Sequence, residues 1–200
     1  MAIPKFSNKV LVVTFLSKET IQKQKNMDFF SKFAFCPACG SSLFEKNNEK
    51  SKRCASCGFV FYMNPSAAVA AFIVNEKQEL LVCRRKKEPA KGTLDLPGGF
   101  VDNNETAEEA LKREISEELQ SEAKNVRYLF SLPNEYEYCD LLVPTLDLFF
   151  SCKLPDETSL VPSDDVEESF FVPFSEIRPE LFGLKSVKKA IERFLQHPIG

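Results

Sequence analysis

The sequence predicts an α/β protein in which a small cysteine-rich module precedes a domain of mixed strands around two helices. Three observations support this class. Two Cys-x-x-Cys pairs lie close together before residue 60, short apolar strand candidates recur over residues 67–172, and two segments show helical spacing of apolar residues. With 200 residues, 44% of them apolar, the chain is long enough for one domain plus a small module.

Residues 1–32 are expected to form an N-terminal extension outside both folded units. The apolar run 10–16 follows two lysines, but it is far too short to span a membrane and lacks a small-residue cleavage site. Met27 is a second candidate start. Residues 1–26 would then be a poorly ordered extension or lie upstream of the working protein, and an ordinary strand over 10–16 is the alternative.

Residues 33–62 carry the pattern of a zinc ribbon. Cys36-Pro-Ala-Cys39-Gly and Cys54-Ala-Ser-Cys57-Gly are separated by fourteen residues, and the polar stretch 45–52 between them suits a hairpin. Four thiolates in two close pairs match the tetrahedral coordination of zinc, and no position is left open for a catalytic water. The zinc is therefore expected to be structural. A redox role is disfavoured because the motif occurs twice without a βαβ context.

The number of cysteines and the charge of the chain indicate the cellular compartment and the kinds of partner to expect. Seven cysteines at these spacings do not form a secreted disulfide scaffold, so a reducing cytoplasm is expected. The net charge of −3 argues against a general nucleic-acid binder. Residues 1–60 carry +6 and the remainder −9, which suits divalent metal binding in the second part. Lys50, Lys52 and Arg53 on the ribbon are more typical of a solvated face.

After a boundary at Pro65, the strand candidates follow in order. Residues 67–74 and 79–84 flank a turn at 75–78, and residues 94–96 lead into Pro97-Gly98-Gly99. Further strands are expected at 126–130, 146–153 and 170–172. Residues 186–196 place apolar side chains at helical spacing and predict a closing helix that packs on the core.

An acidic helix is the most informative feature of the second half. Thr106 and Glu109 form a capping box that marks its start. Glu114, Glu117 and Glu118 then share an arc of about 100° with the apolar positions of the helix. Burial of negatively charged carboxylates on the core-facing side of a helix is unfavourable unless a positive charge compensates them. A divalent cation, which prefers oxygen ligands, would provide that charge.

Residues 99–118 resemble the Nudix box, in which a Gly and a Glu precede an Arg-Glu pair and a later Glu-Glu pair. The resemblance implies an α/β/α sandwich over residues 65–200 and a pyrophosphohydrolase that uses Mg²⁺ or Mn²⁺. The chain departs from the pattern where Gln120 replaces Gly and Ser121 replaces an apolar residue. If that Gly serves as a left-handed helix terminus, Gln costs about 1 kcal/mol there.

The resemblance also assigns roles to single residues. It implies that Glu114, Glu117 and Glu118 are metal ligands, that Gly99 adds a backbone ligand, and that Arg113 and Glu105 brace the loop. In this family an acidic residue from a loop after the box often joins the site. Asp165 is the residue that fits this position best, although a solvated acidic loop is an equal alternative.

A zinc ribbon ahead of a Nudix domain resembles NADH pyrophosphatases and ADP-ribose pyrophosphatases. Their motif after the box survives here only as Ser131 and Pro133, and the chain has no Trp, so NADH specificity does not carry over. A small nucleotide such as ADP-ribose or a dinucleotide is expected, with Tyr136 or Tyr138 able to stack on a base. The alternatives are a non-catalytic Nudix-fold ligand sensor and a nucleic-acid-binding zinc-ribbon protein. A homodimer is left open.

Overall fold

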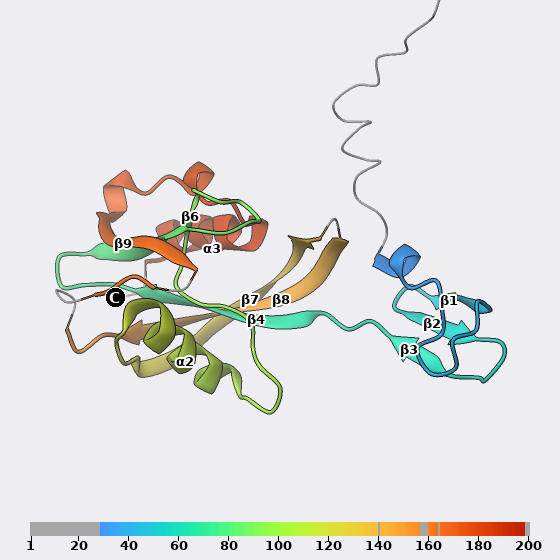
Figure 1. Cartoon of the computed structure of the whole chain (residues 1–200). Helices are drawn as coiled ribbons and strands as arrows, with labels where there is room; N and C mark the ends of the chain where they lie inside the picture. The colour runs from blue at the N-terminus through green and yellow to red at the C-terminus, as the bar shows by residue number, and fades with distance from the viewer. Residues whose placement is uncertain (1–28, 140, 157–159, 164, 199–200) are drawn as a thin grey trace, which may run out of the picture.

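The computed structural model describes residues 29–139, 141–156, 160–163 and 165–198 (Figure 1). Most of the predicted extension, including residues 1–26 and the alternative strand at 10–16, lies outside the described residues. The described part begins with a short 3-10 turn, η1 (Phe29–Lys32). None of its helices has the length and apolar character needed to cross a bilayer.

The cysteine-rich module contains a small antiparallel sheet of its own. Its strands are β1 (Phe44–Asn48), β2 (Ser51–Cys54) and β3 (Val60–Tyr62), in the order β1-β2-β3. The hairpin expected at 45–52 is confirmed by β1 and β2. Cys36, Phe44 and Cys54 form its buried centre. Since so few apolar residues are buried, this module depends on something besides its core for stability.

The larger part contains two three-stranded sheets. The mixed sheet has the order β4-β8-β7, with β4 (Ser66–Ile73) parallel and β7 (Lys124–Tyr138) antiparallel to β8 (Leu141–Lys153). The second sheet is antiparallel and has the order β6-β5-β9, formed by β6 (Leu94–Asp95), β5 (Glu79–Arg85) and β9 (Val166–Pro173). The predicted strand at 126–130 therefore continues to Tyr138. It passes through Pro133, which is tolerated because β7 is an edge strand paired only with β8.

Two helices cover opposite faces of β4 and β5 (Figure 1). Alternate side chains of a strand point to opposite faces, so each of these strands contributes to two cores. Residues such as Val69 and Ala71 pack with α2 (Ala107–Leu119), whereas Ala70 and Phe72 pack with α3 (Lys185–Gln196). Short 3-10 turns η2 (Phe174–Glu176) and η3 (Pro179–Leu181) precede α3. This arrangement confirms the predicted α/β/α class.

Both ends of α2 follow from its sequence. The Thr106 hydroxyl accepts the N–H of Glu109 while the Glu109 carboxylate accepts the N–H of Thr106, which is the predicted capping box. At the other end Gln120 adopts the left-handed conformation, with φ 51° and ψ 38°. The Nudix-like segment has Gln120 where the pattern has glycine, yet the chain keeps the left-handed turn that glycine favours. Gln120 therefore adopts the conformation for which a conformational cost was expected.

Candidate active site and cysteine cluster

The loop between β6 and α2 lies so close to its neighbours that two of its positions have no room for a side chain. At Gly98, with φ +147°, a Cβ atom would lie 2.1 Å from the carbonyl oxygen of Val69. At Gly99 a Cβ atom would lie 2.4 Å from the Glu114 carboxylate. The Gly99 carbonyl accepts the N–H of Val69 at 2.8 Å, which fixes the loop on β4. The loop backbone is thereby held directly against the acidic helix.

Arg113 connects this loop to the helix. Its Nε and Nη2 atoms donate to the two oxygens of Glu105 at 3.0 and 3.1 Å, a bidentate pair. Nη1 donates to Glu114 at 2.8 Å and to Glu117 at 3.0 Å, and Nη2 also donates to the Phe100 carbonyl at 2.9 Å. One guanidinium thus fixes two helix carboxylates relative to the loop.

Glu118 is the most buried of the helix carboxylates, with 6% of its surface exposed. Burial raises its pKa well above the ordinary value, although the N–H of Gly98, which donates to it at 2.9 Å, acts in the opposite direction. Glu114, Asp95 and Asp165 raise the pKa further through charge repulsion. A cation beside this group would favour its charged form.

The structure brings the residues implied by the resemblance together. Gly99, Glu105, Arg113, Glu114 and Glu118 lie at the loop and the adjoining helix face, and most of the Glu114 side chain is buried. The expected burial is less complete for Glu117, whose side chain is 49% exposed. Asp165 approaches from the start of β9, where it forms an ion pair with Lys87.

A cavity of about 300 Å³ joins these acids to an aromatic pair. Its lining includes Asp165 and the carboxylates of α2, and also Phe100 and Tyr136. The two rings form an edge-to-face contact with centroids 5.2 Å apart. Of the two tyrosines expected to contact a base, Tyr136 reaches the cavity, while Tyr138 is 62% exposed and lies outside its lining.

The cavity also contains charged residues that were not predicted from the sequence, among them Arg85, Asp95 and Asp147. Arg85 donates to Asp95 at 2.6 Å, yet burial still raises the pKa of Asp95, and nearby Asp147 adds to that shift. Asp147 accepts hydrogen bonds from Thr145, at 2.6 Å, and from Ser186. The available signal was a lone Asp within an apolar strand, at Leu-Asp-Leu in both 94–96 and 146–148.

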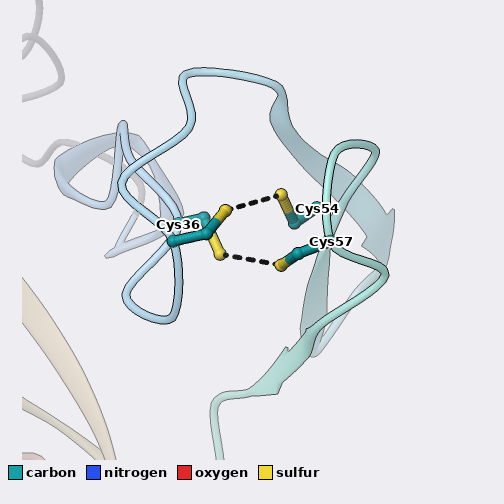
Figure 2. Close-up of side chains that lie close together, drawn as sticks. Cys36, Cys54 and Cys57 are labelled. Carbon is teal, nitrogen blue, oxygen red and sulfur yellow. Dashed lines mark hydrogen bonds between the residues drawn. The ribbon is translucent and has the colours of Figure 1, made fainter.

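The four cysteines of the ribbon form a compact cluster. Their sulfur atoms all lie within 4.8 Å of one another. Cys36 contacts Cys57 and Cys39 contacts Cys54, each at 3.7 Å, and Figure 2 marks these sulfur–sulfur contacts with dashed lines. Backbone N–H groups, that of Cys57 above all, lower the pKa of the Cys54 thiol to about 6. Four sulfurs that converge this closely fit a tetrahedral zinc ion.

One of the basic residues on the ribbon is not on its surface. Lys52 is 8% exposed, and its ammonium group donates to the carbonyl of Phe33 and lies 4.8 Å from the centre of the Phe44 ring. Of the three basic residues Lys50, Lys52 and Arg53, Lys52 is therefore buried inside the ribbon and does not belong to a solvated face.

The acidic helix offers a different set of ligands from that of the ribbon. Carboxylates and the second lone pair of the Gly99 carbonyl are oxygen donors, which Mg²⁺ and Mn²⁺ prefer. Among the described residues, however, only the four cysteines bring three or more ligand atoms within 4.8 Å of one another. The donor chemistry of the helix fits a hard divalent cation.

Comparison with known proteins agrees with this geometry. Residues 64–194 match the family model described as NUDIX domain. The chain belongs to the NUDIX family. Among curated Nudix relatives, it is 37% identical over 103 residues to the NAD-capped RNA hydrolase NudC of Chromobacterium violaceum, and 30% identical over 124 residues to that of Deinococcus radiodurans. These matches cover 52% and 60% of this chain but 38% and 44% of the relatives, so the chain spans less than half of their length.

Solved Nudix structures confirm the fold. A NUDIX hydrolase from Nitrosomonas europaea superposes with a TM-score of 0.63 at 23% identity, covering 82% of this chain and 91% of the other. The NUDIX domain of Shewanella oneidensis NrtR, crystallised with ADP ribose, gives a TM-score of 0.56 at 17% identity, covering 69% and 91%. The predicted family resemblance and the α/β architecture are thus confirmed.

Proposed function

We propose that this Nudix protein hydrolyses the pyrophosphate of nucleoside diphosphate derivatives. The observation that carries the proposal is the cavity, which places an acidic helix beside an aromatic pair. The helix suits metal-bound phosphates, and the rings of Phe100 and Tyr136 suit a planar base. A substrate with both parts can occupy both regions at once.

Each residue of the site has a role in the proposed reaction. Glu114, Glu117 and Glu118 would hold Mg²⁺ or Mn²⁺ together with the backbone of Gly99. Such ions polarise the pyrophosphate, activate water and neutralise the leaving phosphate. Arg113, locked by Glu105, keeps Glu114 and Glu117 in register with the loop. Asp165, just before β9, adds a carboxylate to the lining of the same cavity.

The proposed organisation has two units. Residues 33–62 form a ribbon in which Cys36, Cys39, Cys54 and Cys57 hold a structural zinc ion, and residues 65–200 form the hydrolase domain. The sulfur cluster supports the first assignment, and the burial of Lys52 supports a role other than nucleic-acid binding. All seven cysteines are unpaired, which supports a cytoplasmic location. A homodimer stays a prediction.

For the substrate, the proposal ranks ADP-ribose and dinucleotides above nucleoside triphosphates. The named relatives act on NAD-capped RNA, and the NrtR domain binds ADP ribose. The absence of Trp from the segment after the box ranks NADH below ADP-ribose. Tyr136, held at the cavity wall, is the aromatic residue best placed to contact a base.

The test measures catalytic efficiency on ADP-ribose, NADH, a diadenosine polyphosphate and dGTP, each with Mg²⁺ and with Mn²⁺. Glu117→Gln serves as the inactive variant, and Glu108→Gln, an exposed change on the same helix, as its matched control. Turnover of ADP-ribose that Glu117→Gln abolishes and Glu108→Gln preserves supports the proposal. A clear preference for dGTP overturns the ranking. Ligand binding without any turnover favours the sensor alternative.

A further inference from the structure

A polar stripe crosses the otherwise apolar face of the mixed sheet that α3 covers. Asn134 of β7 is the register partner of Thr145 of β8. Asp147, two residues further along β8, shares the face of Thr145 and lies opposite Leu132. Asn134, Thr145 and Asp147 are each at most 8% exposed. Burial of polar groups is unfavourable unless they are satisfied, so this stripe needs an explanation beyond packing.

Asp147 is the charged residue of the stripe. It accepts hydrogen bonds from two neutral hydroxyl groups, those of Thr145 and Ser186. A carboxylate has about four acceptor positions, so about half remain available. Asp95, which also lines the cavity, has Arg85 as a counter-ion. No such cation lies within ion-pair distance of Asp147 among the described side chains, although Asp147 lines the cavity.

Strand register places Asp147 in line with Phe100. Ala68 of β4 is the register partner of Asp147 and also forms a bridge with Phe100. Phe100, Ala68 and Asp147 therefore form one row across three neighbouring backbone segments, with steps of about 4.8 Å. The side chain of Ala68 is only a methyl group, so it leaves space between the side chains of Phe100 and Asp147. A planar ring in this space would contact Phe100 on one side and point its edge at Asp147 on the other.

We propose that Asp147 selects a base that carries an NH₂ group, an inference that rests on the proposed function. An amino or carboxamide N–H would donate to the open acceptor positions of the carboxylate. A carbonyl or a carboxylate at the same place on the base would face a buried negative charge and leave both groups unpaired. The adenine amino group and the nicotinamide carboxamide share this chemistry, and the test separates them.

The experiment compares two substrate pairs that differ only in this group. ADP-ribose is compared with inosine diphosphate ribose, and NADH with its reduced nicotinic acid analogue. The parent protein is expected to prefer the NH₂-bearing member of one pair by at least about tenfold in kcat/KM; that pair identifies the base in the cavity. Asp147→Asn, whose amide both donates and accepts, should reduce the preference to about threefold or less. Glu137→Gln, an exposed change on β7, should preserve it.

Several outcomes decide the inference. Equal efficiency of the parent protein within both pairs overturns it, as does a full preference retained by folded Asp147→Asn. Thermal unfolding checks the fold of that variant, and if the variant does not fold, the parent comparison still decides. If nothing is hydrolysed, the proposed function fails separately. In that case calorimetry compares the affinity for AMP with that for IMP, and the affinity for nicotinamide mononucleotide with that for its nicotinic acid counterpart. The inference predicts tighter binding of the NH₂-bearing member of one pair. Equal affinities within both pairs overturn it.

Discussion

Replacing Gly99 by alanine tests whether the position of Glu114 matters for catalysis. The added Cβ would lie 2.4 Å from Oε1 and 2.5 Å from the carboxyl carbon of Glu114. Ordinary contact begins at 3.4 Å, so the carboxylate must move by about 1 Å from the place where Arg113 holds it. A displacement of about 1 Å at a catalytic group can cost about 100-fold in rate. We therefore expect kcat/KM on the best substrate to fall about 100-fold.

Thermal unfolding and activity together isolate the cause. Gly99 does not need a left-handed backbone, so the folded state of Gly99→Ala should keep its melting temperature within about 2 °C of the parent value. Gly92→Ala is the matched control, because Gly92 has φ +80° but no atom within 4 Å of an added Cβ. That change should lower stability by about 1 kcal/mol and leave activity unchanged. Parent-like activity in a folded Gly99→Ala protein would refute the reasoning.

Four further predictions address the box, its exit and the ribbon. Glu117→Gln should keep the fold and lower turnover by several orders of magnitude at saturating Mg²⁺; near-parent turnover would contradict the site assignment. Gln120→Gly should stabilise the protein by about 1 kcal/mol in urea unfolding, because it removes a side chain from a left-handed residue. In metal-free protein, folded Glu118 binds a proton that the unfolded chain releases, so the free energy of unfolding should fall as pH rises through its raised pKa. Glu118→Gln should remove that decline while abolishing turnover, and an unchanged decline would exclude Glu118 as its source. Elemental analysis should find one zinc per chain, and four titratable native thiols at positions 36, 39, 54 and 57 without zinc would argue against it.

Local signals in the sequence predicted the features that depend on local structure. The capping box at Thr106 and the left-handed residue at Gln120 are both present, because each depends on neighbours within one helical turn. The cysteine cluster was predictable for a similar reason. Its spacing brings two short turns together, and the two pairs do converge.

Features that depend on distant strands escaped prediction. The predicted strand ends at residue 130, yet residues 131–138, which include Pro133, continue β7 as an edge strand. Arg85, Asp95 and Asp147 come from three strands, and no spacing rule connects them. Glu117 lies on the predicted arc of the helix, but its outer position leaves about half of its side chain in water. Strand pairing decides which of these groups meet, and a single sequence does not show it.

The parallel pairing of β4 with β8 has a consequence for synthesis of the chain. Ser66 pairs with Thr145, so β4 emerges from the ribosome long before the strand that completes it. The ribbon, whose four sulfurs all precede residue 60, is free to close around the proposed zinc ion in that interval. The edge of β4 that pairs with β8 must meanwhile stay open and exposed to other nascent chains. Chains truncated before residue 153 should therefore retain the zinc-dependent module but aggregate through β4.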